Sequence, residues 1–197
     1  MLNKNYMKKK IIITGGLGYI GTELCKLYSG VSWYHNITVI DNRFISERVN
    51  QIRNWNMDFV QGDILDKDLI KKYFSDADIV HHLAGVTEVP RVKSEASIEQ
   101  DEKIKKVGEQ GTQNILDVIS DSCKIIFPST HVVYEGINQV KTDIKEEEET
   151  KPVLSYSSSK AFNEKQLKKS GKNYIILRLG SVYGYSTDSM RIDIMPN

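Results

Sequence analysis

The chain has 197 residues, of which 40% are apolar and 27% are charged, and its formal net charge is +1. This length supports one domain with a full hydrophobic core, and the balanced charge gives no electrostatic case for binding nucleic acid or an anionic membrane. The two cysteines stand in apolar surroundings, which suits free thiols in a reducing cytoplasm. No Cys/His cluster has metal-ligand spacing, so we expect no metal site.

Short apolar runs alternate with helix-like segments along the chain. The apolar runs are Lys10–Thr14, Ile37–Asp41, Met57–Gln61, Ile79–Leu83, Lys124–Pro128 and Tyr174–Leu179. The helix-like segments are Gly18–Ser29, Ser46–Asn54, Lys67–Phe74, Glu99–Ser120 and Leu154–Ser170. This alternation predicts an α/β fold of the Rossmann type, a doubly wound parallel sheet that binds ligands at the carboxyl ends of its strands. The first run is too short for a signal peptide, and none is long enough for a transmembrane segment.

A glycine-rich turn joins the first strand to the first helix. Its glycines follow a G-x-x-G-x-x-G spacing, and each has a separate task in binding a dinucleotide. Gly15 lets the chain leave the strand, Gly18 lets a pyrophosphate approach the backbone, and Gly21 lets the helix pack closely on the sheet. The helix N-terminus then offers free N–H groups and a positive dipole end to the phosphates. The alternative is a glycine-rich turn that binds no ligand.

Two acidic residues end the second and third strands. Asp41 lies about 20 residues beyond the glycine turn, where a carboxylate accepts the ribose hydroxyls and repels a 2′-phosphate, which favours NAD over NADP. Arg43 is a counter-signal, and the alternative for Asp41 is a cap on the next helix. Asp63, in Gly62-Asp63-Ile64, could meet the adenine edge or serve only as a turn residue.

The fourth strand ends in His81-His82-Leu83-Ala84-Gly85. Ala84 and Gly85 are small enough for the backbone to lie against a cofactor. The two histidines alternate in face on a strand, and one of them is better explained as a packed core residue than as a base.

The segment from Tyr156 to Lys160 is the most informative motif. Positions i and i+4 share one face of a helix, so the phenol and the ammonium point the same way. A neighbouring ammonium stabilises the phenolate and lowers its pKa, which produces a general base near neutrality. After the fifth strand, Ser129 or Thr130 would hydrogen-bond a substrate oxygen at the nicotinamide. The alternatives are an ordinary helix pair and turn capping by a hydroxyl.

Taken together, these motifs resemble the extended short-chain dehydrogenase/reductase family, in its branch of NAD-dependent sugar-nucleotide epimerases and dehydratases. The matching text runs in family order through Thr14–Gly21, Ile40–Asn42, Gly62–Ile64, His82–Gly85, Gly111–Leu116, Val133–Tyr134, Tyr156–Lys160 and Leu177–Gly184.

The resemblance implies a role for each matching residue. Those expected to bind NAD are Gly15, Gly18, Tyr19, Ile20, Gly21, Asp41, Asn42, Asp63, Ile64, Leu83, Ala84, Gly85, Ser129, Tyr156 and Lys160. Among them, Asp63 and Ile64 would meet adenine, and Leu83 to Gly85 would line the path to the nicotinamide. Thr130, Tyr156 and Lys160 match the catalytic Ser/Thr–Tyr–Lys set.

Three departures from the family pattern bear on activity. Members that dehydrate or decarboxylate often carry acidic residues just after the catalytic hydroxyl, whereas Thr130–Tyr134 contains none, which favours an epimerase or a simple reductase. Gly108 stands where the family often has an asparagine that supports the active site. Family members also run to roughly 300 residues, as expected for a nucleotide domain plus a substrate lobe.

We therefore expect a polar extension at 1–9, an NAD-binding domain at 10–185, and the start of a substrate-binding lobe, most of which is missing, at 186–197, where Ser189–Asp193 resembles its beginning. The predicted function is NAD-dependent epimerisation of a nucleotide sugar through a transient keto intermediate. The alternatives are an NAD(P)H-dependent reductase and an NAD-binding module without catalysis. The resemblance also implies a homodimer joined through Glu99–Ser120 and Leu154–Ser170, and the two cysteines favour a cytoplasmic location.

Overall fold

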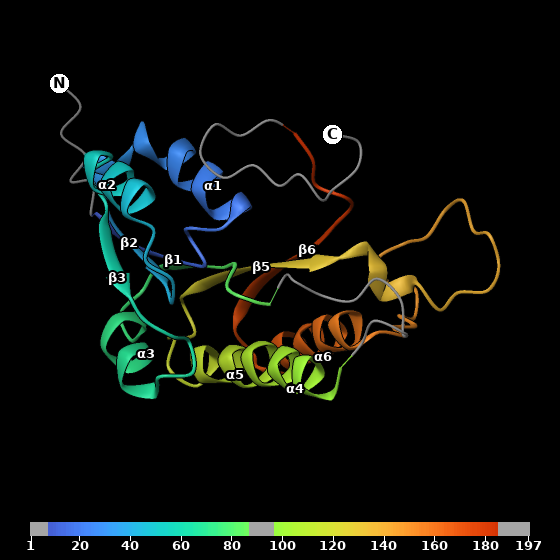
Figure 1. Cartoon of the computed structure of the whole chain (residues 1–197). Helices are drawn as coiled ribbons and strands as arrows, with labels where there is room; N and C mark the ends of the chain where they lie inside the picture. The colour runs from blue at the N-terminus through green and yellow to red at the C-terminus, as the bar shows by residue number, and fades with distance from the viewer. Residues whose placement is uncertain (1–7, 87–96, 185–197) are drawn as a thin grey trace, which may run out of the picture.

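The computed structural model describes residues 8–86 and 97–184, which form one parallel sheet with helices on both faces (Figure 1). The strands are β1 (Lys9–Thr14), β2 (His35–Asp41), β3 (Asp58–Gln61), β4 (Ile79–His82), β5 (Lys124–Thr130) and β6 (Asn173–Leu179). Their order is β3-β2-β1-β4-β5-β6, and every pair is parallel. This is the strand order of the Rossmann fold, so the predicted fold class is confirmed.

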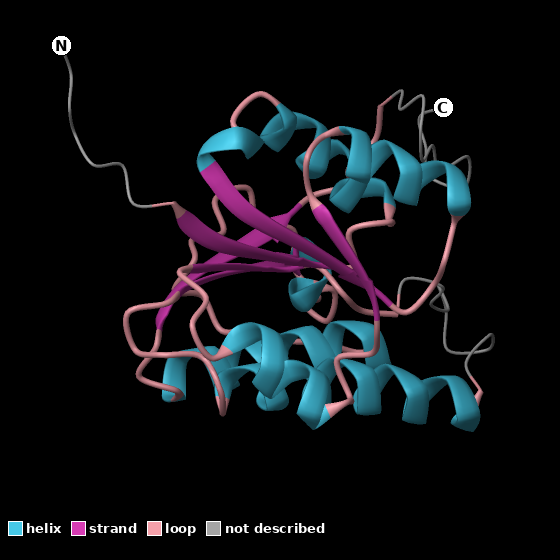
Figure 2. Cartoon of the chain, turned by 90° about the vertical axis from the view of Figure 1, so that its left-hand side faces the viewer, coloured by secondary structure: helices cyan, strands magenta, loops and turns pink. Residues whose placement is uncertain are grey.

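The helices form one layer on each face of the sheet, as Figure 2 shows edge-on. They are α1 (Tyr19–Ser29), α2 (Ser46–Asn54), α3 (Lys67–Phe74), α4 (Ile98–Lys105), α5 (Gly111–Leu116) and α6 (Ser155–Lys169). Helices α1 and α2 cover one face, and the other four cover the opposite face. Each observed helix or strand begins and ends within two residues of its prediction, apart from the segment Glu99–Ser120.

Strand β1 lies at the centre of the sheet and contributes to both cores. Ile11 and Ile13 pack on the side of α1 and α2, whereas Ile12 packs on the side of α3, α5 and α6. Side chains of a strand alternate between faces, so a run of three isoleucines buries apolar surface on both. Each fully buried isoleucine is worth roughly 1.5–3 kcal/mol relative to exposure. The central strand thus anchors the turn that follows it.

The predicted single helix Glu99–Ser120 is instead α4, a π-helical turn at Lys106–Gln110, and α5. Two glycines let this segment pack closely against α6 and against the loop after β3. A Cβ on Gly108 would overlap the Ser159 hydroxyl of α6, and one on Gly111 would overlap the Ile64 side chain. The wider turn lies where this segment packs on α6, a common place for a π-bulge in a helix. The expected dimer helix is therefore irregular at its centre.

Strand β6 forms one edge of the sheet, and its two faces differ. Ile176 packs on the core beside α6, whereas Ile175 and Leu177 are 40% and 43% exposed. The expected domain boundary falls close to this strand. The expected lobe at 186–197 lies outside the described residues, as does most of the extension at 1–9.

Candidate functional site

The glycine turn has the strained geometry that only glycine tolerates. Gly15 has a φ of +66°, and its N–H donates to Ile40 O at 2.7 Å. A Cβ at Gly15 would stand 2.8 Å from Ala84 N, so the loops after β1 and β4 touch here. A Cβ on Gly21 would overlap Gly15 O, so this glycine lets α1 pack closely on the turn that ends β1.

Helix α1 starts at this turn without a capping side chain. Its N-cap residue is Gly18, which has no side chain to accept the first N–H groups of the helix, and its first turn contains no acidic residue. An uncapped helix N-terminus with a Cβ-free approach is the arrangement that binds a pyrophosphate. Of the two neighbours expected beside it, Tyr19 donates its hydroxyl to Gly184 O at 2.6 Å, and Ile20 is 38% exposed. The turn therefore fits a dinucleotide.

Asp41 is buried at the end of β2 and holds the glycine turn. Its Oδ2 accepts the Leu17 N–H at 3.0 Å, and its Oδ1 accepts the backbone N–H of Arg43 at 3.0 Å and the Arg43 Nε at 3.3 Å. Helix α2 has Ile45 at its N-cap with no side-chain cap, so the helix-capping alternative for Asp41 is wrong. Asn42 is exposed beside it, and its carbonyl accepts the Gln61 side-chain amide at 3.2 Å.

The residues expected near adenine and the nicotinamide path differ in accessibility. Asp63 Oδ1 accepts the Leu65 N–H at 2.9 Å, a local turn of the kind that was the alternative for this residue. Ile64 is buried in the core, which leaves mainly its backbone to face a ligand. Leu83 and Ala84 are half-buried, and Gly85 is exposed.

A buried chain of hydrogen bonds runs beneath the loop after β4. Thr14 Oγ1 accepts the Ala84 N–H at 3.0 Å and contacts His82 Nδ1 at 3.1 Å, and His82 Nε2 contacts Thr112 Oγ1 at 3.0 Å. Burial, assisted by the charge of Lys160, lowers the pKa of His82 to about 3. A neutral ring that accepts at Nδ1 and donates at Nε2 satisfies every partner. His81 points to the other face and contacts the Tyr28 hydroxyl at 2.8 Å, so both histidines are packed residues.

Lys160 and Tyr156 lie on the side of α6 that faces the carboxyl end of β5. The Lys160 Nζ donates to Pro128 O at 2.8 Å, lies 4.4 Å from the Phe127 ring centroid, and lies 5.9 Å from the Tyr156 ring centroid. Burial lowers the pKa of the Lys160 ammonium to about 8. Thr130 ends β5, and its Oγ1 accepts the Val132 N–H at 3.3 Å. The ammonium is therefore held beside both the phenol and the end of the strand that carries the threonine.

Sequence reasoning missed a buried ion pair behind these residues. Arg178 of β6 binds Glu164 of α6 with two nitrogens, at 2.9 and 2.6 Å, and Ser129 donates its hydroxyl to Glu164 Oε1 at 2.6 Å. Burial alone would raise the pKa of Glu164, but the hydrogen bonds from Arg178 and Ser129 outweigh burial and lower it. The sequence signal that could have drawn attention to Glu164 is its position four residues beyond Lys160, which places both on the same face of α6.

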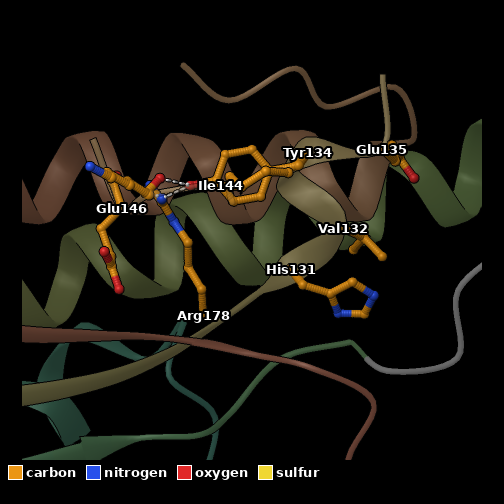
Figure 3. A pocket seen from close by; sticks show the side chains of 8 residues that line it. His131, Val132, Tyr134, Glu135, Ile144, Glu146 and Arg178 are labelled. Atoms are coloured by element: carbon orange, nitrogen blue, oxygen red, sulfur yellow. Dashed lines mark hydrogen bonds between the residues drawn. The ribbon is translucent and has the colours of Figure 1, made fainter. Parts of the chain in front are cut away.

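A cavity of about 540 Å³ opens beside this ion pair (Figure 3). Its lining residues are His131, Val132, Tyr134, Glu135, Ile144, Lys145, Glu146 and Arg178. The Arg178 Nη1 donates to the Tyr134 hydroxyl and to Glu146 O, so the guanidinium holds the walls together. Its first lining residue, His131, directly follows Thr130 in the chain. No sequence pattern predicted this cavity.

Gly108 faces α6 rather than open space. Its carbonyl accepts the Asn163 side-chain amide at 3.1 Å, and a Cβ here would clash with the Ser159 hydroxyl. An asparagine here would have to displace Ser159 from this packing. Helix α6, which carries Tyr156 and Lys160, therefore packs closely against Gly108 at this point.

The family model described as "NAD dependent epimerase/dehydratase family" matches residues 11–195, a span that contains the glycine turn and all three expected catalytic residues. The chain belongs to this family. Among curated relatives, dTDP-D-glucose 4,6-dehydratase of Dictyostelium discoideum is 29% identical, over 89% of this chain and 44% of its own length. UDP-N-acetyl-alpha-D-glucosaminuronate decarboxylase of Bacillus cytotoxicus is 33% identical, over 65% of this chain and 38% of its own length. The chain therefore spans less than half of these two family members.

A solved family structure shows the same arrangement. UDP-glucose 4-epimerase from Brucella ovis, in complex with NAD, superposes with a TM-score of 0.72 at 28% identity, over 90% of this chain and 54% of the epimerase. Relatives of similar identity include epimerases, dehydratases and a decarboxylase, so identity alone does not choose among these reactions. Over residues 8–86 and 97–184, no helix is long and apolar enough to cross a membrane, and no cluster of three or more His, Cys, Asp or Glu side chains is placed to hold a metal.

Proposed function

We propose that this chain forms the NAD-binding part of a nucleotide-sugar epimerase that works through a transient keto intermediate. One observation carries the proposal. The Lys160 ammonium is fixed at the carboxyl end of β5 by Pro128 O and the Phe127 ring, on the same helix face as Tyr156, and Thr130 is the last residue of that strand. An ammonium beside a phenol and a hydroxyl is the set needed to remove a proton from an alcohol.

In this proposal NAD lies across the carboxyl ends of the strands. Gly15, Gly18 and Gly21, at the uncapped start of α1, would hold the pyrophosphate, with Tyr19 and Ile20 beside it. The adenosine lies near Asp41, Asn42, Asp63 and the backbone of Ile64. Tyr156 and Lys160 would hold the nicotinamide ribose, and Leu83, Ala84, Gly85 and Ser129 would line the path to it. Tyr156 and Lys160 lie on α6, and the other residues lie at the carboxyl ends of strands or in the loops and the helix start that follow them.

NAD would supply a hydride acceptor for the oxidation of a sugar alcohol. Tyr156 removes the hydroxyl proton, and Thr130 hydrogen-bonds the same oxygen. The nearby positive charge of Lys160 favours the phenolate and so lowers the pKa of Tyr156. Return of the hydride to the other face of the ketone would invert the centre, with Tyr156 giving its proton back to the same oxygen. This requires the chain to retain both the ketone and the dinucleotide.

The position of Glu135 favours epimerisation over dehydration or decarboxylation. It is the first acidic residue after Thr130, and its Oε1 accepts the N–H groups of Val153 and Leu154, at 2.7 and 2.8 Å, and the Ser157 hydroxyl. These hydrogen bonds hold the pKa of Glu135 below its usual value, although burial acts in the opposite direction. A carboxylate committed to the start of α6 is poorly placed to serve as an acid at the sugar.

The test compares the wild-type chain with Tyr156→Phe on a panel of UDP- and dTDP-sugars. We expect the wild type to interconvert a sugar pair without net reduction of NAD, as followed by NMR and by absorbance at 340 nm. Tyr156→Phe should lose at least about a hundredfold in rate, the usual worth of a general base, and keep its affinity for NAD. Equal turnover in the variant would remove Tyr156 as the base. Stoichiometric use of NADH or NADPH would favour the reductase alternative.

We also propose that the protein is a homodimer joined through α4, α5 and α6. These helices lie together on one face, where Ile98 and Phe162 are 81% and 44% exposed. Exposed apolar residues on neighbouring helices support a two-fold interface. The free, buried thiols of Cys25 and Cys123 support a cytoplasmic location.

A further inference from the structure

A second cavity lies at the amino ends of the strands, on the edge of the sheet opposite the proposed dinucleotide site. Its volume is about 530 Å³, and its lining residues are Lys8, His35, Asn36, Ile37, Arg53, Asn56, Met57 and Asp58. They lie at or next to the starts of β1, β2 and β3 and at the end of α2. The six residues of β1, at about 3.3 Å each, separate this cavity from the glycine turn by roughly 20 Å. We call it the amino-edge cavity.

The amino-edge cavity carries positive charge that no neighbouring group neutralises. Lys8 and Arg53 are exposed, and neither forms an ion pair or a side-chain hydrogen bond in the part of the chain that the structure describes. Asp58 is the single acidic residue of the lining, and no ion pair joins it to either cation. Two cations and one carboxylate leave the cavity with net positive charge, which favours an anionic ligand.

A histidine and two asparagines add polar groups that lack a partner. The Nδ1 atom of His35 is buried and has no hydrogen-bond partner among the described residues. The side-chain amides of Asn36 and Asn56 are exposed and make no hydrogen bond to that part of the protein. A buried polar atom without a partner costs free energy, which a hydrogen bond to a ligand would recover, and amide N–H groups are donors. These groups therefore suit a ligand that is rich in oxygen atoms.

The carboxyl end of α2 borders the amino-edge cavity and carries about half a negative charge, which opposes an anion. Its last carbonyl groups are already hydrogen-bonded, since Ile52 O accepts the Met57 N–H at 3.3 Å and Arg53 O accepts the Asn56 N–H at 3.0 Å. The full charges of Lys8 and Arg53 therefore outweigh the charge of the helix end.

We propose that the amino-edge cavity is a second ligand site, which binds a phosphate-bearing ligand. Arg53 pairs with phosphate oxygens through its planar guanidinium, whose donors match their geometry, and Lys8 adds a second cation. His35 and Asn56 complete the site with hydrogen bonds. A volume of about 530 Å³ is in the range of sites for small organic ligands, so the phosphate belongs to a larger molecule or to a diphosphate. None of these residues belongs to the proposed dinucleotide site, so the two sites can be tested separately.

The experiment titrates the isotope-labelled full chain with sodium pyrophosphate at constant ionic strength and follows its amide signals by NMR. The amides of Asn36 and Asn56 report on the amino-edge cavity, and those of 15–21 report on the glycine turn. We expect the cavity signals to saturate with a dissociation constant of about 1 mM, as two charge-assisted hydrogen bonds support. Arg53→Gln should weaken this binding at least about tenfold and leave the response of the glycine turn unchanged. Lys169→Gln is the matched control, because it removes one exposed positive charge from the last turn of α6.

Sedimentation with phosphatidylglycerol vesicles distinguishes the two sources of such a phosphate. Sedimentation of the wild type but not of Arg53→Gln would assign the site to a lipid headgroup, whereas binding of pyrophosphate alone would assign it to a soluble ligand. Cavity signals that do not saturate would overturn the inference, as would an equal loss in Arg53→Gln and Lys169→Gln, which would show general charge screening. Saturation confined to 15–21 would also overturn it, while leaving the proposed dinucleotide site intact.

Discussion

The buried histidine beneath the nucleotide site should make the stability of this protein depend on pH. His82 is 1% exposed, and burial with the charge of Lys160 lowers its pKa to about 3, against an ordinary value of 6.5. Between about pH 6.5 and pH 3, His82 is therefore protonated in the unfolded chain and neutral in the folded chain. The stability contributed by the neutral ring is complete above about pH 6.5 and is lost as the pH falls toward 3.

The size of the effect follows from the two pKa values. Each pKa unit is worth about 1.4 kcal/mol, so the full loss, reached below pH 3, is about 5 kcal/mol, and the loss at pH 5 is about 2 kcal/mol. The variant His82→Gln keeps one donor and one acceptor toward Thr14 and Thr112 but does not titrate. We expect it to be less stable than the wild type at pH 7.5 by about 1–3 kcal/mol, because the ring contacts are lost.

The assay is urea denaturation followed by circular dichroism at several pH values between 7.5 and 5. The difference in unfolding free energy between wild type and His82→Gln should shrink by about 2 kcal/mol over this range. His81, whose pKa is also lowered by burial, is present in both proteins and cancels. Parallel curves for the two proteins would refute the reasoning, since they would show that His82 does not stay neutral in the folded state.

Two further substitutions test the supports of the site by urea denaturation. Gly15→Ala should lower the free energy of unfolding by at least about 2 kcal/mol, because φ is +66° and the new Cβ would stand 2.8 Å from Ala84 N. A stability equal to that of the wild type would contradict the observed turn. Glu164→Gln should cost about 3–5 kcal/mol, because it breaks the buried pair with Arg178. The exposed control Glu149→Gln should stay within about 0.5 kcal/mol of wild type, and an equally small loss in Glu164→Gln would show that the ion pair adds nothing.

Local patterns in the sequence predicted the fold well because they report local physics. Apolar runs such as Ile11–Ile13 predicted buried strands, and two helices, Ser46–Asn54 and Lys67–Phe74, begin and end as predicted. The glycine turn was recognisable from its spacing, since a positive φ at Gly15 requires glycine. The Tyr156–Lys160 pair was recognisable because i and i+4 share a helical face.

These local patterns could not predict contacts between segments that are distant in the sequence. The interruption of Glu99–Ser120 by a π-helical turn coincides with its packing on α6, and no residue within it specifies that partner. The pairing of Glu164 with Arg178 depends on α6 lying over β6.

The sequence by itself determined the order of strands and helices along the chain and the turn that fits a dinucleotide, and it predicted Thr130, Tyr156 and Lys160 as the catalytic residues, because these depend on spacing within short segments. Only the tertiary structure decided which side chains hydrogen-bond or pair with one another when the chain has folded. It paired Asp41 with Arg43 at the glycine turn and buried His82 between two threonines. Charge state and hydrogen-bonding capacity depend on burial and on partners, and both arise only when the chain has folded.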